Sequence, residues 1–106
     1  MATPQRSTTL RETEKGFQAA VIELAQRSGW LTYHTWRSIH SPAGFPDLVL
    51  CRPPRLIFAE LKNATGKITV NQEQWLTILG LLGEEVEVYL WRSADFDDIV
   101  TLLQRR

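Results

Sequence analysis

A chain of 106 residues with 43% hydrophobic and 23% charged side chains is typical of one globular domain and has no room for a second. Its twelve basic and twelve acidic residues balance to a net charge of zero, which argues against a protein that simply coats nucleic acid electrostatically. The single cysteine excludes an intrachain disulfide. No stretch is apolar enough for a secretion signal or a membrane span, so we expect a cytoplasmic protein without membrane partners.

The N-terminal part of the chain predicts a short tail and a helix. Residues 1–8 are polar and predict a flexible tail that precedes a single domain over 9–106. Thr9 and Glu12 have the spacing of a capping box, so a helix should begin there. Apolar residues then recur at helical spacing until residue 28, and these are Phe17, Ala20, Val21, Leu24 and Ala25.

Three strands should follow this helix. The segment 30–36 is aromatic and β-branched and predicts a strand, and the Ser-, Pro- and Gly-rich segment 37–46 predicts a loop. The apolar runs 47–51 and 56–61 are separated by two arginines and two prolines, which predicts a hairpin. Because both faces of 56–61 are largely apolar, this strand should lie inside a sheet that helices cover on both sides.

The remainder of the chain predicts a helix, a strand and a last helix. Thr69 and Gln72 form a second capping box, from which a helix should run until Gly83 stops it. Segment 85–91 alternates like a strand, and 95–103 is periodic like a helix. The order helix, three strands, helix, strand, helix predicts an α/β fold with a mixed sheet flanked by helices.

The predicted hairpin brings three charged residues together. If its turn is centred on Pro53 and Pro54, antiparallel partners have residue numbers that sum to 107, and Asp47 lies opposite Glu60. Directly opposed residues have Cβ atoms about 4.5 to 5.5 Å apart, and Lys62 shares the face of Glu60. Two carboxylates about 4 Å apart repel by roughly 4 kcal/mol at an effective dielectric constant of about 20. Such a pair needs a cation between its members or must hold a proton.

A divalent cation meets this need and indicates a hydrolytic site. Carboxylate oxygens suit Mg²⁺ or Mn²⁺ and leave coordination positions for water and a substrate phosphate. Asp47, Glu60 and Lys62 would then hydrolyse a phosphodiester, with Lys62 orienting water or neutralising charge in the transition state. The alternative is that Asp47 and Glu60 flank a surface hairpin and Lys62 forms an exposed ion pair, which would contribute little.

Glu14 is a further candidate for this site. It shares a helical face with Phe17 and should therefore direct a carboxylate at the sheet, as a metal ligand or as an acid that positions a water. The alternative is a favourable negative charge in the first turn of the helix. Glu12 is better explained as part of the cap.

Other polar and aromatic residues have a structural explanation beside a functional one. His34 and His40 belong to no cluster with zinc-like spacing. Basic residues in the predicted loops could contact phosphate or be solvated, namely Arg37, Arg52, Arg55 and Lys67. Three tryptophans could stack on bases or, as is commoner, belong to the core, and these are Trp30, Trp36 and Trp91.

Taken in order, these residues resemble a known nuclease family. The tetrapeptide Gly44-Phe45-Pro46-Asp47 followed by Glu60-Leu61-Lys62 resembles the PD-(D/E)xK nuclease signature. Over residues 12–103 the chain is similar, more narrowly, to the VRR-Nuc family of virus-type replication and repair nucleases. The additional elements of this likeness are Glu14, Phe17-Gln18, Gly29-Trp30, Tyr33-His34, Gln72 and Trp75-Leu76.

The resemblance implies a fold and a set of site residues. It implies a restriction-endonuclease-like core of helix, three strands, helix and strand, with Mg²⁺ or Mn²⁺ held by Asp47, Glu60 and the main-chain carbonyl of Leu61. Lys62 matches the catalytic lysine of the family, and Glu14 matches its helix glutamate. Gln72 matches a polar position at the start of the following helix, where the capping box explains it equally well.

The resemblance also implies partners. Stand-alone members of the family are similar to structure-selective endonucleases of branched DNA, including homodimeric resolvases of four-way junctions, in phage or bacterial replication and repair. No organic cofactor is implied. Four apolar residues could supply a dimer face or could be core, namely Trp75, Leu76, Leu81 and Leu82. The alternative function is a nucleic-acid-binding or assembly module that has the fold without catalysis.

Overall fold

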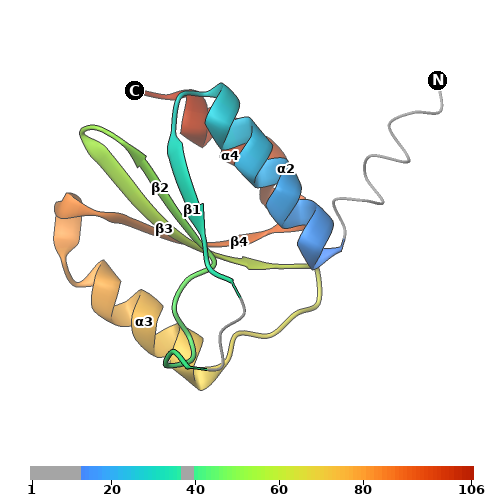
Figure 1. Ribbon diagram of the computed structural model, residues 1–106, viewed down its shortest axis with the longest axis vertical. Helices are drawn as coiled ribbons and strands as arrows, with labels where there is room; N and C mark the ends of the chain where they lie inside the picture. The colour runs from blue at the N-terminus through green and yellow to red at the C-terminus, as the bar shows by residue number, and fades with distance from the viewer. Residues whose placement is uncertain (1–12, 37–39) are drawn as a thin grey trace.

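The computed structural model describes residues 13–36 and 40–106. The predicted tail and the capping box at Thr9 and Glu12 lie outside these residues. The described chain folds into one four-stranded sheet in the order β1-β2-β3-β4, with helices on both sides of it (Figure 1). The predicted α/β class with a mixed sheet and a C-terminal helix is therefore confirmed.

The elements follow the predicted order. The strands are β1 (Leu31–His34), β2 (Leu48–Arg52), β3 (Arg55–Lys62) and β4 (Glu87–Arg92). The α-helices are α2 (Glu14–Arg27), α3 (Val70–Gly80) and α4 (Phe96–Gln104), and two 3₁₀ turns, η1 (Gly83–Glu85) and η2 (Ser93–Asp95), flank β4. Among the described helices, none combines the length and the apolar character that crossing a membrane requires.

Helix α2 begins at a side-chain cap. The hydroxyl of Thr13 accepts a hydrogen bond from the Gly16 amide at 3.0 Å, which satisfies a donor that the first helical turn leaves unpaired. The helix ends at Arg27, and Gly29 takes a φ of 89° in the turn into β1. A glycine favours this backbone conformation because it lacks a Cβ.

The hairpin has the predicted register. Strands β2 and β3 pair antiparallel from Leu48 opposite Ala59 to Arg52 opposite Arg55, so partner numbers sum to 107. Strand β1 adds antiparallel to β2, and β4 adds parallel to β3. Strand β3 is therefore an interior strand with helices on both faces, as its apolar sequence predicted.

The two faces of the sheet differ in how well they are covered. Alternate residues of β2 and β3 are fully buried against α2 and α4, namely Leu48, Leu50, Ile57, Ala59 and Leu61. The other set, which includes Val49, Phe58 and Glu60, faces the side on which α3 lies (Figure 1). On that side Phe45 packs edge-to-face against both Phe58 and Trp75. The main core therefore lies between the sheet and α2 and α4.

Helix α3 starts as predicted and ends earlier than predicted. The hydroxyl of Thr69 accepts from the Gln72 amide, and the Gln72 side chain accepts from the Thr69 amide, so the capping box is confirmed. The helix stops at Gly80, and the chain continues through the C-cap Leu81 into η1. No residue of α3 is fully buried, and Leu81 and Leu82 are 76% and 55% exposed. The core interpretation is thus wrong for these two leucines, because they lie beyond the part of the helix that meets the sheet.

Candidate metal centre

The open end of the β2–β3 hairpin brings together the three residues that the sequence singled out. Asp47 immediately precedes β2, and Glu60 and Lys62 belong to the last three residues of β3. Lys62 Nζ lies 3.2 Å from Glu60 Oε2, and Asp47 Oδ2 accepts a hydrogen bond of 2.9 Å from the amide of Leu61. Continuation of the strand register places Asp47 opposite Glu60.

The charges of this site are buried. Glu60 is 1% exposed and Lys62 is 8% exposed. The alternative of an exposed surface ion pair is therefore wrong. An ionised carboxylate and an ammonium in this position lose most of their hydration, which is costly unless other groups compensate.

The environment of Glu60 is electrostatically unfavourable for a carboxylate. Burial raises its pKa most, the charge of Asp47 raises it further, and Lys62 lowers it, with a resulting value of about 7. Neither Oε1 nor Oε2 accepts a hydrogen bond of normal geometry from the described part of the chain. A buried carboxylate with unfilled acceptor capacity beside a second carboxylate fits a bound cation, because the cation would satisfy both.

The available donors suit Mg²⁺ or Mn²⁺ better than Zn²⁺. Among residues 13–36 and 40–106, no three His, Cys, Asp or Glu side chains are grouped so that they could hold a metal ion. Asp47 and Glu60 are the two carboxylate side chains that this site offers a cation. Mg²⁺ is commonly bound by one or two carboxylates, with water and substrate phosphate at its other positions. The role of the Leu61 carbonyl as a further ligand stays a prediction.

The loop before Asp47 is held by backbone constraints. Gly44 has a φ of 103°, and a Cβ at this position would lie 2.6 Å from the main-chain carbon and oxygen of Asn71. On the other side, the Thr35 hydroxyl donates to the Pro46 carbonyl at 2.8 Å, and the Thr35 amide donates to the Asp47 carbonyl at 2.9 Å. The glycine of the Gly-x-Pro-Asp sequence thus lets the loop approach α3, and β1 fixes the backbone of Asp47.

Arg92 is a residue of this region that the sequence did not reveal. It pairs with Lys62 across the parallel strands β3 and β4. Its guanidinium donates to the carbonyl of Asn63 at 3.1 Å and to that of Gly66 at 2.6 Å, so it holds the chain that leaves β3. No sequence motif predicts this contact, because it depends on the parallel pairing of segments about thirty residues apart.

Glu14 is not brought into the cluster. As the first residue of α2 it lies at the same end of the sheet as Asp47, because α2 leads antiparallel into β1, which ends next to β2 residue Leu48. However, α2 covers the opposite face from Glu60, and Glu14 is exposed. The expectation that it directs its carboxylate at the sheet is wrong. The physical reason is that the first residue of α2 that is buried in the core is Phe17, a turn further on.

Gln72 and the two histidines are the remaining candidates that the structure describes. The side-chain oxygen of Gln72 accepts from the Thr69 amide at 2.9 Å, as the capping interpretation predicted, so its catalytic role stays a prediction. The ring of His34 lies 5.3 Å from that of Trp36, and His40 is exposed.

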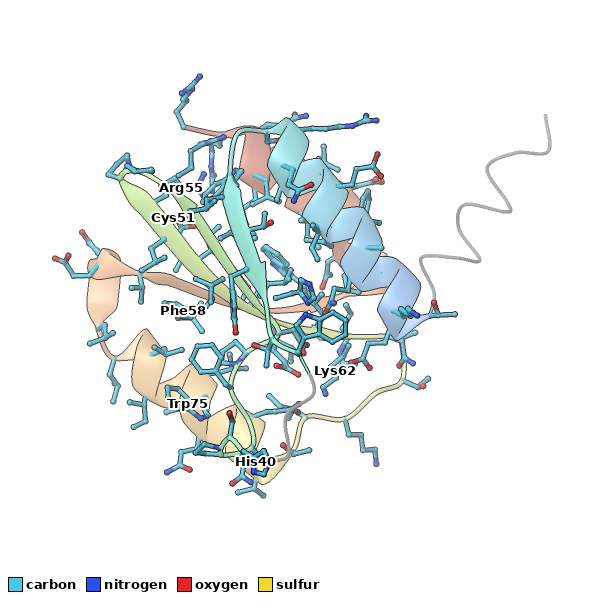
Figure 2. The ribbon with its side chains drawn as sticks, viewed as in Figure 1. His40, Cys51, Arg55, Phe58, Lys62 and Trp75 are labelled. Atoms are coloured by element: carbon cyan, nitrogen blue, oxygen red, sulfur yellow. The ribbon has the colours of Figure 1, made fainter. Side chains whose placement is uncertain are left out.

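The arginines of the hairpin turn lie at the wrong end for phosphate contacts. Figure 2 shows Arg55 at the end of the sheet opposite to Lys62. Arg55 forms a two-pronged ion pair with Glu87 at 2.7 and 2.8 Å, and Arg52 donates to the carbonyls of Ser28 and Leu103. The interpretation that Arg52 and Arg55 contact a phosphate at the candidate metal centre is therefore wrong. The two guanidinium groups fasten the hairpin turn to α2, β4 and the C-terminus. Lys67 is exposed in the segment between β3 and α3, and Arg37 lies outside the described residues.

No family model, curated protein or solved structure matches the chain.

Proposed function

We propose that this protein is a Mg²⁺- or Mn²⁺-dependent DNA endonuclease of the VRR-Nuc type, within the PD-(D/E)xK nucleases, that hydrolyses phosphodiester bonds in branched DNA such as four-way junctions. The observation that supports this function best is the pair Asp47 and Glu60. Glu60 is fully buried beside the like charge of Asp47, and its ion pair with Lys62 at 3.2 Å compensates it only in part. Such a charge cluster is costly for stability, and sites of this kind are usually functional.

Each residue of the cluster has a distinct task in this proposal. When bound between Asp47 and Glu60, the cation supplies electrostatic stabilisation of the charge that develops on the scissile phosphate. Asp47 is held for this task by the Leu61 amide, which fixes one carboxylate oxygen and leaves the other available. Lys62 donates to a phosphate oxygen or to the attacking water, and Glu60 fixes the position of its ammonium.

The proposal includes a homodimer in the cytoplasm of a bacterial or phage-infected cell. Paired incisions across a junction require two active sites, and a short chain has one. We assign the dimer face to the C-terminal end of α3, where three apolar side chains are at least 55% exposed, namely Ile78, Leu81 and Leu82.

The second candidate function is a nucleic-acid-binding or assembly module without catalysis. The cluster of buried Glu60 and Lys62 beside Asp47 argues against it, because loss of catalysis would remove the need to bury Glu60 next to a like charge.

A cleavage assay tests the proposal. A labelled four-way junction, a flap and a linear duplex are incubated with the wild-type protein in Mn²⁺, with and without chelator. The test variant is Asp47→Asn, which keeps an oxygen that can accept from the Leu61 amide and loses the charge. The matched control is Glu84→Gln, which alters an exposed carboxylate of η1. We expect chelator-sensitive cutting of branched DNA by the wild type and the control, and none by Asp47→Asn. Cutting that resists chelator or survives in Asp47→Asn would refute the mechanism, and binding without cutting would favour the module.

A further inference from the structure

An aromatic cavity lies on the α3 side of the sheet. Its volume is about 620 Å³, within the range of ordinary ligand sites. Edge strand β1, the loop before Asp47 and helix α3 all contribute to its walls. The described residues whose side chains matter most are Tyr33, Thr35, Trp36, Ser41, Phe45 and Trp75. Figure 2 shows Trp75 on α3 and Phe58 on the sheet, and Phe45 packs edge-to-face against both rings.

The rings of this cavity are unusually accessible. Trp36 is 75% exposed and Tyr33 is 59% exposed, whereas Trp30 and Trp91 are buried in the core. The core interpretation of the tryptophans is thus right for two and wrong for Trp36. The opposite wall is fixed, because Phe45 and Trp75 meet edge-to-face with ring centroids 5.0 Å apart. A flat ring open to solvent beside a rigid aromatic wall is the arrangement on which a second planar group can stack.

The cavity lies beside the loop that leads to the candidate metal centre, because Gly44 and Phe45 line it and Asp47 follows two residues later. Thr35, which stands between the two exposed rings in β1 and its extension, donates hydrogen bonds to the carbonyls of Pro46 and Asp47. Tyr33 also faces the same side of the sheet as Glu60, as the strand register shows. A phosphate held at Asp47 and Lys62 would therefore lie at the end of the loop that forms one wall of the cavity.

We propose that this cavity binds an unpaired nucleobase of the substrate strand, next to the phosphate that is cut. The inference rests on the proposed nuclease function and specifies how the substrate is chosen. Every base offers a π-face, so stacking on Trp36 and Tyr33 tolerates all sequences. In a continuous duplex the bases are stacked on one another and are unavailable to this ring. At a flap, or at a branch point where base pairs open readily, a base reaches the cavity at a lower unstacking cost. The cavity thus selects DNA by structure without base-edge contacts.

Binding measurements on three variants test the site. Fluorescence anisotropy of a labelled twelve-nucleotide single strand is followed in chelator, where cleavage does not interfere. Trp36→Ala should bind roughly 5- to 150-fold more weakly than the wild type, the range for loss of one base-stacking contact. Trp36→Phe, which keeps a ring, should recover much of the affinity. The matched control is Leu31→Ala, which removes a side chain of equal exposure, 76% against 75%, at the start of β1 and outside the lining of the cavity.

A second probe isolates stacking from contacts to the sugar-phosphate chain. The wild type should bind a strand of the same length made of abasic nucleotides more weakly than the normal strand. Trp36→Ala should bind the two strands equally, because the group that distinguishes them is gone. If Trp36→Ala discriminates between the strands as the wild type does, the stacking site is refuted. A Trp36→Ala variant that changes the oligomeric state in sedimentation, with unaltered affinity, would instead assign the ring to a contact between copies and would also refute it.

The outcomes separate this inference from the proposed function. Chelator-sensitive cleavage with unaltered single-strand binding by Trp36→Ala overturns the stacking site and leaves the nuclease standing. Base-dependent binding by the wild type without cleavage of any DNA structure overturns the nuclease and leaves a nucleic-acid site. Absence of both binding and cleavage overturns both.

Discussion

The pH dependence of stability offers the most direct test of how Glu60 is held. Its carboxyl group has a pKa of about 7 in the folded protein, against 4.5 without the fold. The folded state therefore retains a proton that the unfolded chain has already released. The stabilisation that results is fully present below pH 4.5 and is lost as the pH rises through 7.

The size of this effect follows from the shift. At about 1.4 kcal/mol per pKa unit, the free energy of unfolding should fall by roughly 3 kcal/mol in total, of which roughly 2 to 3 kcal/mol falls between pH 5 and pH 8. Solvent screens the electrostatic interactions of Glu60 only weakly, because its side chain is 1% exposed. The fall is a large fraction of the stability of a small domain.

The assay is urea unfolding in chelator from pH 5 to pH 8, with the wild type and Glu60→Gln measured side by side. The difference between their unfolding free energies should change with pH by the amount given above, because other titrating groups are common to both. The matched control is Glu23→Gln, which alters an exposed carboxylate that pairs with Arg27 on the surface of α2. Its difference from the wild type should stay constant.

Addition of Mn²⁺ should oppose the fall in stability as the pH rises. Cation and proton compete for Glu60, so the affinity for Mn²⁺ should rise by up to about tenfold per pH unit below pH 7 and level off above it. A wild-type minus Glu60→Gln difference that is constant from pH 5 to pH 8 would refute the reasoning. It would mean that Glu60 is hydrated or hydrogen-bonded in solution.

Three other predictions concern the surroundings of the site. Gly44→Ala should lower stability by more than about 1 kcal/mol in urea unfolding, because its Cβ would meet the Asn71 backbone at 2.6 Å and the φ of 103° is strained for alanine; unchanged stability would show that the loop adapts. The variants Thr69→Ala and Gln72→Ala should each lower the free energy of unfolding by about 1 kcal/mol or less, and the two folded variants should cleave DNA equally fast. A slower cleavage rate for Gln72→Ala alone would assign Gln72 a catalytic role. Asp47→Asn should leave stability nearly unchanged while cleavage in Mn²⁺ falls by on the order of 100-fold or more, and a parallel loss of both would mark Asp47 as structural.

Local chemistry made much of the fold predictable. Two prolines between apolar runs set the centre of the hairpin, and a period of two residues then determined which residues oppose one another. The Thr69 and Gln72 box fixed the start of α3 because the cap depends only on residues three positions apart. The same locality explains why Asp47, Glu60 and Lys62 could be grouped from sequence.

Properties that depend on distant segments were not predictable in this way. The outward position of Leu81 follows from where α3 ends, and the burial of Glu60 and the exposure of Trp36 likewise depend on segments distant in the sequence, which no local pattern predicts. The prediction for the direction of the Glu14 side chain was wrong for a related reason. A helical wheel gives the face of a residue, but the position at which the helix passes beyond the sheet is a tertiary property.

The two ends of the hairpin show how the chain separates stability from function. At the turn end the Arg55 guanidinium lowers the pKa of Glu87, and the hydroxyl of Tyr89 donates to the same carboxylate at 2.7 Å. At the open end Glu60 is more deeply buried, and its ion pair with Lys62 is opposed by the like charge of Asp47. Because both ends belong to the same two strands, a general weakness of the hairpin cannot explain the difference. The open end is instead a place where the fold tolerates partly compensated charge, and a cation together with a phosphate is the ligand pair that would complete the compensation.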